Sequence, residues 1–321
     1  MDTPPWDIAF GPVPSRRLGR SVGINNISPK TCTYACAYCQ VGRTTDLLLR
    51  RRAFVEPERL AGEITRHVRA ARARGEEIDY LTFVADGEPT LDGNLGREIA
   101  LLKPLGIPIA VISNASLMST AAVRRDLARA DWVSVKVDAT EEEVWRRVNH
   151  PHRRLELARI LDGIARFARA FHGHLVSETM LVAGRNDAPD ILARTAEFLG
   201  GIAPACAYLA APIRPPADPR VRAPGPAALN EAYQIFADRL PCVELLIGYE
   251  GSAFAATGDA AHDLLSITAV HPMRGDAVAE LLARSGAEWS VVDELLAQRR
   301  LRQVDHQGRS FYVRVLPRRA P

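Results

Sequence analysis

The chain has 321 residues, of which 47% are hydrophobic, and a formal net charge of +3. This length and composition predict a globular protein with one large core or two smaller ones. The small net charge gives no general sign of a nucleic-acid binder, although Arg16, Arg17 and Arg20 offer local anion contacts. No apolar run approaches the roughly 18 residues that span a bilayer, and the acidic, proline-containing start differs from a signal peptide, so we expect a cytoplasmic protein without membrane contact.

The first three cysteines are clustered, and lysine is rare. In the reducing cytosol an odd number of cysteines does not predict a disulfide framework. Three of the five fall within eight residues, which is typical of a metal site, whereas Cys206 and Cys242 lie far from them and from each other.

Of 41 basic residues only three are lysine, and each is a candidate for a specific role: Lys30, Lys103 and Lys136.

Apolar, β-rich runs alternate with longer amphipathic stretches from residue 21 to residue 239. This alternation is typical of parallel strands covered by helices. The predicted strands span residues 21–27, 78–85, 107–113, 132–138, 175–183 and 207–213. The predicted helices span residues 56–75, 118–129, 154–171, 188–199 and 226–239. We therefore expect an α/β fold in which six strand–helix units form a barrel-like sheet, with the loops after the strands meeting at one end.

The character of the sequence changes after about residue 255. Gly286 is expected to end one short helix, Ser290 with Asp293 resembles an N-terminal capping box for the next, and Gln307-Gly308 predicts a hairpin turn. This order predicts a winged helix-turn-helix domain at 260–321 after a barrel domain at 1–255. The acidic N-terminus of its second helix disfavours nucleic acid, so protein docking or closure of the barrel is favoured over RNA or DNA contact.

The segment TCTYACAYCQ carries the strongest chemical signal. It places Cys32, Cys36 and Cys39 at CxxxCxxC spacing, so one loop can hold three thiolates around an iron–sulfur cubane. Three ligands leave one iron open to a second molecule. A structural zinc site would need a fourth ligand, and the nearest histidine, His67, falls inside the first predicted helix. The four-cysteine run of a ferredoxin is also missing, which favours a catalytic [4Fe-4S] cluster.

This spacing, with the aromatic Tyr38 directly before the third cysteine, resembles the radical S-adenosylmethionine (SAM) superfamily. The resemblance implies a partial (β/α)6, TIM-like barrel and a [4Fe-4S] cluster whose open iron binds the amino and carboxylate groups of SAM. It also implies reductive cleavage of SAM to a 5′-deoxyadenosyl radical that abstracts hydrogen from a substrate. A reductant such as flavodoxin or ferredoxin would supply the electron. The substrate is unknown from these motifs.

The cofactor contacts implied by the resemblance follow the predicted strands. Asp86, Gly87, Glu88 and Pro89 resemble the GGEP motif that binds the amino group of SAM, because glycine allows close backbone approach and a carboxylate pairs with an ammonium. Other candidate contacts end later strands, and each has an alternative role in a turn or a buried ion pair. They are Ser113, Asn114, Lys136, Asp138 and Glu178.

Further positions have two interpretations each. Arg214, in the loop after the sixth predicted strand, is a candidate anion clamp or a solvated side chain. His150 and His152 could transfer protons or form a surface turn. Neither pair of alternatives is decided by the residue pattern alone, because each depends on which side chains reach the mouth of the barrel.

Segments such as GPVPSRRLGRSVGINN and ETMLVAGRND resemble a group of bacterial and archaeal radical enzymes. That group is related to the wyosine-base synthases, which modify tRNA, and more distantly to glycyl-radical activating enzymes. Wyosine-base synthases hold a second cluster on three cysteines before the radical motif, and no cysteine precedes Cys32 here. The candidate functions are a radical SAM enzyme of unknown substrate, an RNA-modifying enzyme, an activating enzyme and a redox-sensing DNA-binding regulator. The DGEP motif has no use in a regulator.

Overall fold

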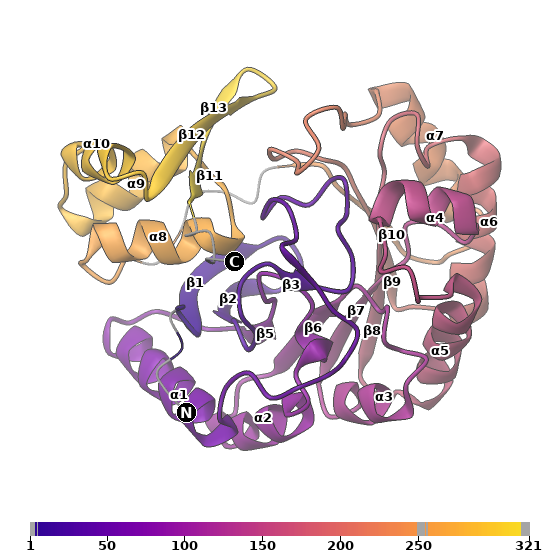
Figure 1. The fold of residues 1–321 in the computed structure, drawn as a ribbon, viewed down its shortest axis with the longest axis horizontal. Coiled ribbons are helices and arrows are strands. Elements are labelled where there is room, and N and C mark those ends of the chain that lie inside the picture. Colours follow the sequence, from indigo (N-terminus) through magenta and orange to yellow (C-terminus); the bar gives the residue numbers. More distant parts are fainter. Residues whose placement is uncertain (1–3, 5, 249–253, 255, 316–321) are drawn as a thin grey trace.

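The computed structural model describes residues 4, 6–248, 254 and 256–315 (Figure 1). Its main sheet has eight strands in the order β1-β2-β5-β6-β7-β8-β9-β10. They are β1 (Ala9–Ser15), β2 (Gly19–Ile24), β5 (Tyr80–Phe83), β6 (Ile109–Ser113), β7 (Trp132–Lys136), β8 (His174–Met180), β9 (Cys206–Ala210) and β10 (Val243–Leu246). β1 is antiparallel to β2, and each later pair of neighbours is parallel, so the carboxyl ends of β2 to β10 lie along one edge.

Helices cover the outside of this curved sheet, as Figure 1 shows. They are α1 (Pro57–Ala73), α2 (Leu95–Leu102), α3 (Ala121–Leu127), α4 (Glu142–Asn149), α5 (Leu157–Ala170), α6 (Pro189–Ile202) and α7 (Pro226–Ala237). In α1, Leu60, Ile64 and Val68 are buried on one face, which is the stripe that their four-residue spacing predicts. Short elements complete this part: β3 (Thr31–Cys32), β4 (Asp46–Leu47), η1 (Pro89–Leu91) and η2 (Lys103–Leu105).

The predicted α/β fold with a large parallel sheet is confirmed, and each of the six predicted strands is present. β1 and β10 were not predicted. β1 contains Pro12 and Pro14, which interrupt a strand pattern but are tolerated in a strand at the edge of a sheet. β10 has only four residues, too few for a clear pattern. The eight-residue helices α2 and α4 were missed for the same reason.

The last part of the chain forms three helices and a small sheet of order β11-β13-β12. The elements are α8 (Ala260–Val270), β11 (Met273–Arg274), α9 (Gly275–Ser285), α10 (Ser290–Ala297), β12 (Leu301–His306) and β13 (Arg309–Arg314). Gly286 ends α9 with a φ of +63°, and Gln307 and Gly308 form the hairpin turn, as predicted. The predicted capping box is wrong: Trp289 is the N-cap of α10 and is already helical in φ and ψ, so no side chain caps the helix.

The C-terminal helices share a core with β1. Phe10 and Val13 pack in one apolar cluster with residues of α8, α9 and α10. Arg314 of β13 reaches back to Asp7, with 3.1 Å between guanidinium nitrogen and carboxylate oxygen. β1 therefore joins the parallel sheet to the C-terminal unit, and Figure 1 shows α8 beside it. Among the described residues, none of the helices is both long and apolar enough to cross a bilayer.

Cys206 and Cys242 form a disulfide, which their spacing in the sequence does not predict. The reason is the register of β9 and β10: Ala207 pairs with Val243, so the two cysteines stand side by side where these parallel strands begin. Their Cα atoms are 4.7 Å apart, although 36 positions separate them in sequence. The expectation that the cysteines form no disulfide framework is therefore wrong for this pair. The three remaining cysteines are free.

Glu98 of α2 and Asp92 form a buried acidic pair behind the DGEP segment. Both side chains are fully buried, and Asn26 Nδ2 lies 3.2 Å from Glu98 Oε2. Burial, with the neighbouring charge of Asp92, raises the pKa of Glu98 to about 9. The folded protein therefore keeps a proton that the unfolded chain releases near the ordinary value of 4.5, so this group favours folding less and less as the pH rises from 4.5 towards 9.

Glu98→Gln is expected to stabilise the protein at pH 8 by roughly 1–3 kcal/mol and to leave its stability at pH 4 nearly unchanged. At pH 8 Glu98 must take up a proton when the chain folds, whereas the amide is neutral in both states. The amide oxygen can still accept from Asn26. Urea unfolding followed by circular dichroism at both pH values measures the two free energies. Glu231→Gln, at an exposed position of α7, is the control that should show no such pH dependence. An equal gain at pH 4 and pH 8 would contradict the assignment.

Candidate active site

A cavity of about 300 Å³ lies at the carboxyl ends of the parallel strands. Its wall contains the cysteine loop, the DGEP segment, the ends of β6, β7 and β8 and the loop after β9. The predicted site residues on the wall are Cys32, Cys36, Tyr38, Cys39, Asp86, Gly87, Glu88, Ser113, Asn114, Lys136 and Glu178. Pro89 and Asp138 are buried and do not lie on the wall. Side chains from six separate segments thus meet in one hollow, as the barrel rule predicts.

The cysteine loop is held by the end of α4. Its backbone N–H groups at Ala35 and Ala37 donate to carbonyls of the last turn of that helix, at 3.0 to 3.2 Å. His152 N–H, just beyond the helix, donates to Thr33 O at 2.9 Å. The carboxyl end of a helix leaves such carbonyls unpaired, so it offers a ready template for a loop. His150 and His152 therefore form the turn that supports the cysteines, and neither lies on the cavity wall.

The three thiols face the cavity without a disulfide partner. Burial raises the pKa of each, that of Cys36 to about 12, so a metal must displace their protons to bind. A single zinc ion with bonds of about 2.3 Å to sulfur would draw its ligands close together. Among the described residues, the groups of metal-binding atoms found within 4.8 Å of one another do not include these three sulfurs. At least one pair of these sulfurs is therefore more than 4.8 Å apart, which is wider than the ligands of one bound zinc ion lie.

The Glu88 carboxylate is bound by groups of the protein. Its Oε1 accepts from Thr90 N–H at 3.0 Å, from Thr90 Oγ1 at 2.6 Å and from Ser113 Oγ at 2.8 Å. Its Oε2 accepts from Asn114 N–H at 2.7 Å. Burial raises its pKa, and these donors act against that shift. Glu88 therefore ties the DGEP segment to the end of β6, and its predicted contact with SAM stays a prediction.

Gly87 lies against the backbone of the cysteine loop. Its φ is +152°, a value that L side chains rarely adopt, and a Cβ atom there would lie 1.7 Å from Thr31 O. Thr31 and Gly87 form a parallel bridge, and Glu88 N–H donates to Thr31 O at 3.1 Å. The glycine thus permits a close backbone approach, as its residue type predicts. In this structure the approach is between the DGEP segment and the cysteine loop.

Asp86 forms an ion pair with Lys30 at 3.0 Å. Burial raises the pKa of Asp86, and the adjacent lysine charge lowers it. The backbone of Lys30 also donates to Asp86 O at 2.7 Å. Lys30 begins the cysteine loop, so this pair fixes the DGEP segment to the loop.

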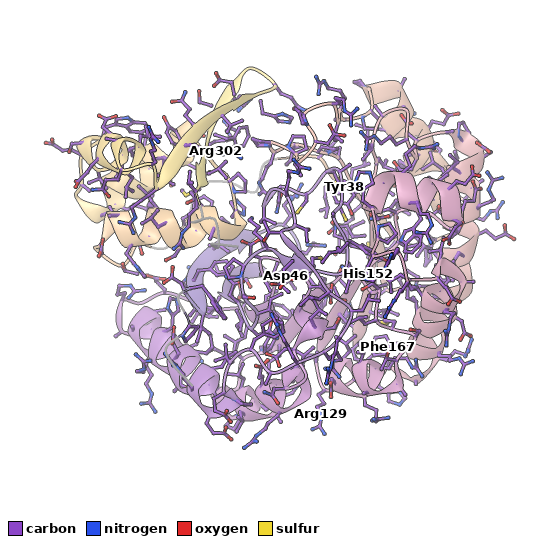
Figure 2. The ribbon with its side chains drawn as sticks, in the orientation of Figure 1. Tyr38, Asp46, Arg129, His152, Phe167 and Arg302 are labelled. Atoms are coloured by element: carbon purple, nitrogen blue, oxygen red, sulfur yellow. A yellow bond between two sulfur atoms is a disulfide. The ribbon has the colours of Figure 1, made fainter. Side chains whose placement is uncertain are left out.

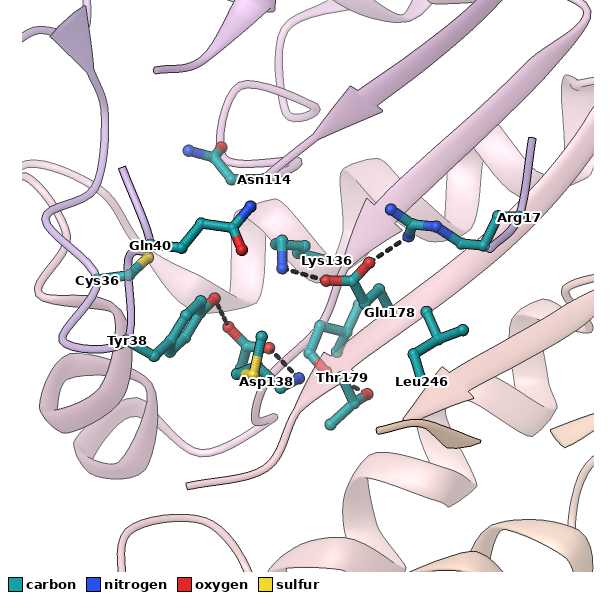
Figure 3. Close-up of polar contacts among 12 residues, drawn as sticks. Arg17, Cys36, Tyr38, Gln40, Asn114, Lys136, Asp138, Glu178, Thr179 and Leu246 are labelled. Carbon is teal, nitrogen blue, oxygen red and sulfur yellow. Dashed lines mark hydrogen bonds and ion pairs between the residues drawn. The ribbon is translucent and has the colours of Figure 1, made fainter. Parts of the chain in front are cut away.

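Glu178 of β8 is paired with two cations, as Figure 3 shows. One oxygen accepts from Lys136 at the end of β7 and the other from Arg17 of the β1–β2 turn. Burial alone would raise the pKa of Glu178, but these two charges outweigh it and hold the pKa below its usual range. The alternative of a buried ion pair was raised for Lys136 with Asp138; the structure instead pairs Lys136 with Glu178. Lys136 also lies 5.3 Å from the centre of the Tyr38 ring.

Tyr38 and Asp138 meet behind the cysteines. The Tyr38 hydroxyl donates to Asp138 Oδ2, and Met180 N–H donates to Asp138 Oδ1 at 2.8 Å (Figure 3). Asn149 Nδ2 also donates to Asp138 Oδ2, at 2.6 Å. Asp138 is thus surrounded by protein donors, and the aromatic residue before Cys39 serves to anchor the loop to β7 and α4.

Arg214 is buried rather than solvated, with 5% of its surface exposed. One guanidinium nitrogen donates to Gln40 Oε1 at 2.7 Å, next to Cys39, and another lies 3.0 Å from His271 Nε2 in the C-terminal unit. His306 and Gln307 of the hairpin contact Pro212 O, at 3.3 and 3.2 Å. The C-terminal unit therefore closes one side of the cavity.

Several residues of the site were not predicted as such. They are Arg17, Lys30, Gln40, Asn149, Met180 and His271. The rarity of lysine could have identified Lys30 as a site residue, because the chain has only three lysines among 41 basic residues. Two of the three, Lys30 and Lys136, lie on the cavity wall. Lys103, the third, pairs with Asp131 at the surface. Of the other arginines proposed as anion contacts, Arg16 donates to Gly248 O at 2.9 Å and Arg20 pairs with Glu77.

The radical SAM superfamily profile matches residues 26–198, more than half of the chain. The chain belongs to the radical SAM superfamily. It is 40% identical to a UPF0026 protein of Methanocaldococcus jannaschii over 96% of both chains. A UPF0026 protein of Helicobacter pylori is 36% identical over 62% of this chain and 63% of its own.

Solved radical SAM structures share the fold. A radical SAM methyltransferase from Sphaerobacter thermophilus superposes with a TM-score of 0.52 at 15% identity, covering 71% of this chain and 66% of its own. A structure of TYW1 with a lysine-pyruvate adduct gives 0.52 at 16% identity, covering 69% and 74%. As a member of this superfamily, the protein has a [4Fe-4S] cluster and SAM as its cofactors. Cys32, Cys36 and Cys39 fit the cluster, because they are free and face the cavity.

Proposed function

We propose that this radical SAM protein is an enzyme that cleaves SAM reductively and uses the resulting 5′-deoxyadenosyl radical to abstract hydrogen from a substrate still to be found. The observation that supports this most is the position of the three free thiols on the wall of a 300 Å³ cavity at the strand ends. The scaffold for this chemistry would be a partial (β/α)6 barrel, with a low-potential reductant such as flavodoxin or ferredoxin in the cytoplasm.

In this proposal the protein holds and shields the reacting groups. The cluster and SAM, when bound, supply the one-electron chemistry. Cys32, Cys36 and Cys39 hold the cluster, and the DGEP segment with Ser113 and Asn114 borders the space for SAM. Lys136 and Glu178 add charged groups to that border. Apolar side chains of the wall exclude water from a reactive intermediate; they include Val41, Val84, Ile112 and Met180.

Anaerobic reconstitution with iron and sulfide, reduction with dithionite and addition of SAM should yield 5′-deoxyadenosine, measured by liquid chromatography. Omitting the reductant should abolish the product, because the cleavage consumes an electron. An intact cluster that yields no 5′-deoxyadenosine, in a protein that binds DNA tightly, would instead support the redox-sensing regulator.

We also propose that the C-terminal unit at 260–321 is a winged helix-turn-helix that closes the barrel of residues 1–255 and contacts a partner, RNA or protein. The order of its helices and strands supports this, and so do its contacts with Arg214 and Pro212 at the cavity. Arg299, Arg300 and Arg302 are exposed at the start of the hairpin, where Figure 2 labels Arg302. Such a basic group would suit an RNA backbone, which keeps an RNA-modifying reaction open; an activating enzyme would instead meet a protein substrate here.

A further inference from the structure

Two asparagines direct their side-chain amides at sulfur atoms of the cysteine loop. Asn149 Nδ2, at the end of α4, lies 3.5 Å from Cys36 Sγ. Asn114 Nδ2, after β6, lies 3.5 Å from Cys32 Sγ. Both distances are normal for a hydrogen bond to sulfur, which is a larger atom than oxygen. Two separate elements of the barrel therefore donate to two different cysteines.

Asn149 is held in this position from several sides. Its side chain is buried, with 2% of the residue exposed. Nδ2 lies 2.6 Å from Asp138 Oδ2 and 3.3 Å from Tyr38 Oη, and the backbone oxygen accepts from Ala35 N–H at 3.2 Å. The amide cannot turn away from Cys36 without giving up its bond to the Asp138 carboxylate. The donor thus stands between a buried carboxylate and a cysteine sulfur.

A hydrogen bond to a ligand sulfur changes the reduction potential of an iron–sulfur cluster. Reduction adds one negative charge, part of which falls on the thiolate sulfurs. An N–H donor stabilises that charge and so makes the cluster easier to reduce. A carboxylate that faces the sulfur with no donor between them makes the cluster harder to reduce, because like charges repel strongly in a buried site. Asn149 makes the cluster easier to reduce in two ways. Its amide donates to Cys36, and it also binds the Asp138 carboxylate, so that a donor stands between this negative charge and the sulfur.

We propose that Asn149 is a positioning residue that fixes Cys36 and raises the potential of the cluster, and that Asn114 acts in the same way on Cys32. This inference rests on the cluster of the proposed enzyme. It adds that the capacity of the protein to accept the electron for SAM cleavage is set in part by two amides outside the CxxxCxxC motif.

The test is a redox titration of the reconstituted full-length protein, followed by electron paramagnetic resonance. Asn149→Leu keeps the branched shape of the side chain and removes the donor, and Asn149→Asp replaces the donor by a carboxyl group. Both variants should take up iron and sulfide as the wild type does and have a more negative midpoint potential, with the larger shift for Asn149→Asp if the group is ionised.

Asn186→Leu is the matched control. Asn186 is also fully buried and also donates to Asp138, through the backbone oxygen at 2.8 Å, but its side-chain bonds go to oxygen and to a backbone N–H and not to a cysteine. Its loss should lower thermal stability and leave the potential unchanged. An equal shift in Asn186→Leu, or no shift in either Asn149 variant, would overturn the proposal.

If the Asn149 variants fold but bind no iron, Asn114→Leu allows the same measurement at Cys32, and an unchanged potential there would also overturn the proposal. Failure of the proposed function is a distinct result. A wild-type protein that assembles the cluster but does not cleave SAM would count against the enzyme, whereas an intact cluster whose potential ignores these amides counts only against this inference.

Discussion

Cys36→Ala is expected to remove the iron–sulfur cluster and SAM cleavage together. Two thiolates cannot hold a cubane in place of three. The side-chain groups that hydrogen-bond to Cys36 are the Asn149 amide and the Tyr38 hydroxyl, and both are also bound to Asp138. Iron should fall from about four atoms per chain to background, the visible absorption of the cluster should vanish, and 5′-deoxyadenosine should no longer form.

The double variant Cys206→Ser, Cys242→Ser provides the control for Cys36→Ala. These two cysteines lie where β9 and β10 begin, at the end of the sheet opposite the cavity, so the variant should keep its iron and its SAM cleavage while losing the stability that the disulfide provides. Retention of a full cluster in Cys36→Ala would show that another residue is the third ligand. Loss of the cluster in the double variant would show that Cys206 and Cys242 are needed to hold the cluster, which the structure does not indicate.

Among substitutions that add a single methyl group to the site, Gly87→Ala is expected to lower stability and iron binding most. The new Cβ would overlap Thr31 O, a backbone atom that cannot rotate away, and the φ of +152° is unfavourable for alanine. We expect the protein to lose about 2–5 kcal/mol of unfolding free energy and to bind less iron, because the displaced Thr31 directly precedes Cys32. Chemical denaturation and iron analysis measure the two effects.

Gly184→Ala separates backbone strain from the clash. Gly184 has a φ of +67°, and apart from its own two chain neighbours no residue has an atom within 4 Å of the Cβ that alanine would add. This variant should lose only about 1–2 kcal/mol and keep its full complement of iron. If both glycine variants behave alike, the contact between Gly87 and Thr31 is not what positions the cysteine loop.

The parallel sheet and the convergence of the motifs could be predicted from the sequence because both follow from local patterns. Buried strands such as 107–113 and 132–138 are continuous apolar runs, and parallel strands necessarily bring the residues after them to one edge. The position of Asn114 on the cavity wall followed directly from this rule. The cluster site could be predicted because its three cysteines lie within eight residues of sequence.

What could not be predicted depends on contacts between distant segments. The pairing of Cys206 with Cys242 depends on the register of two strands, and the burial of Arg214 depends on the C-terminal unit lying over the loop that carries it. Glu88 was expected to face a ligand, yet Ser113, Asn114 and Thr90 supply its donors. A carboxylate at a strand end has the same sequence signature whether it binds a cofactor or the neighbouring strand.

The core shared by β1 and the C-terminal helices has a consequence for synthesis of the protein. Phe10 and Val13 leave the ribosome early, but α8 and α9, which cover them, are made near the end of translation. The nascent chain therefore carries an apolar strand that has no permanent cover while the rest of the sheet assembles. Such a strand is a natural binding site for chaperones, and slow or interrupted translation should increase aggregation of this protein.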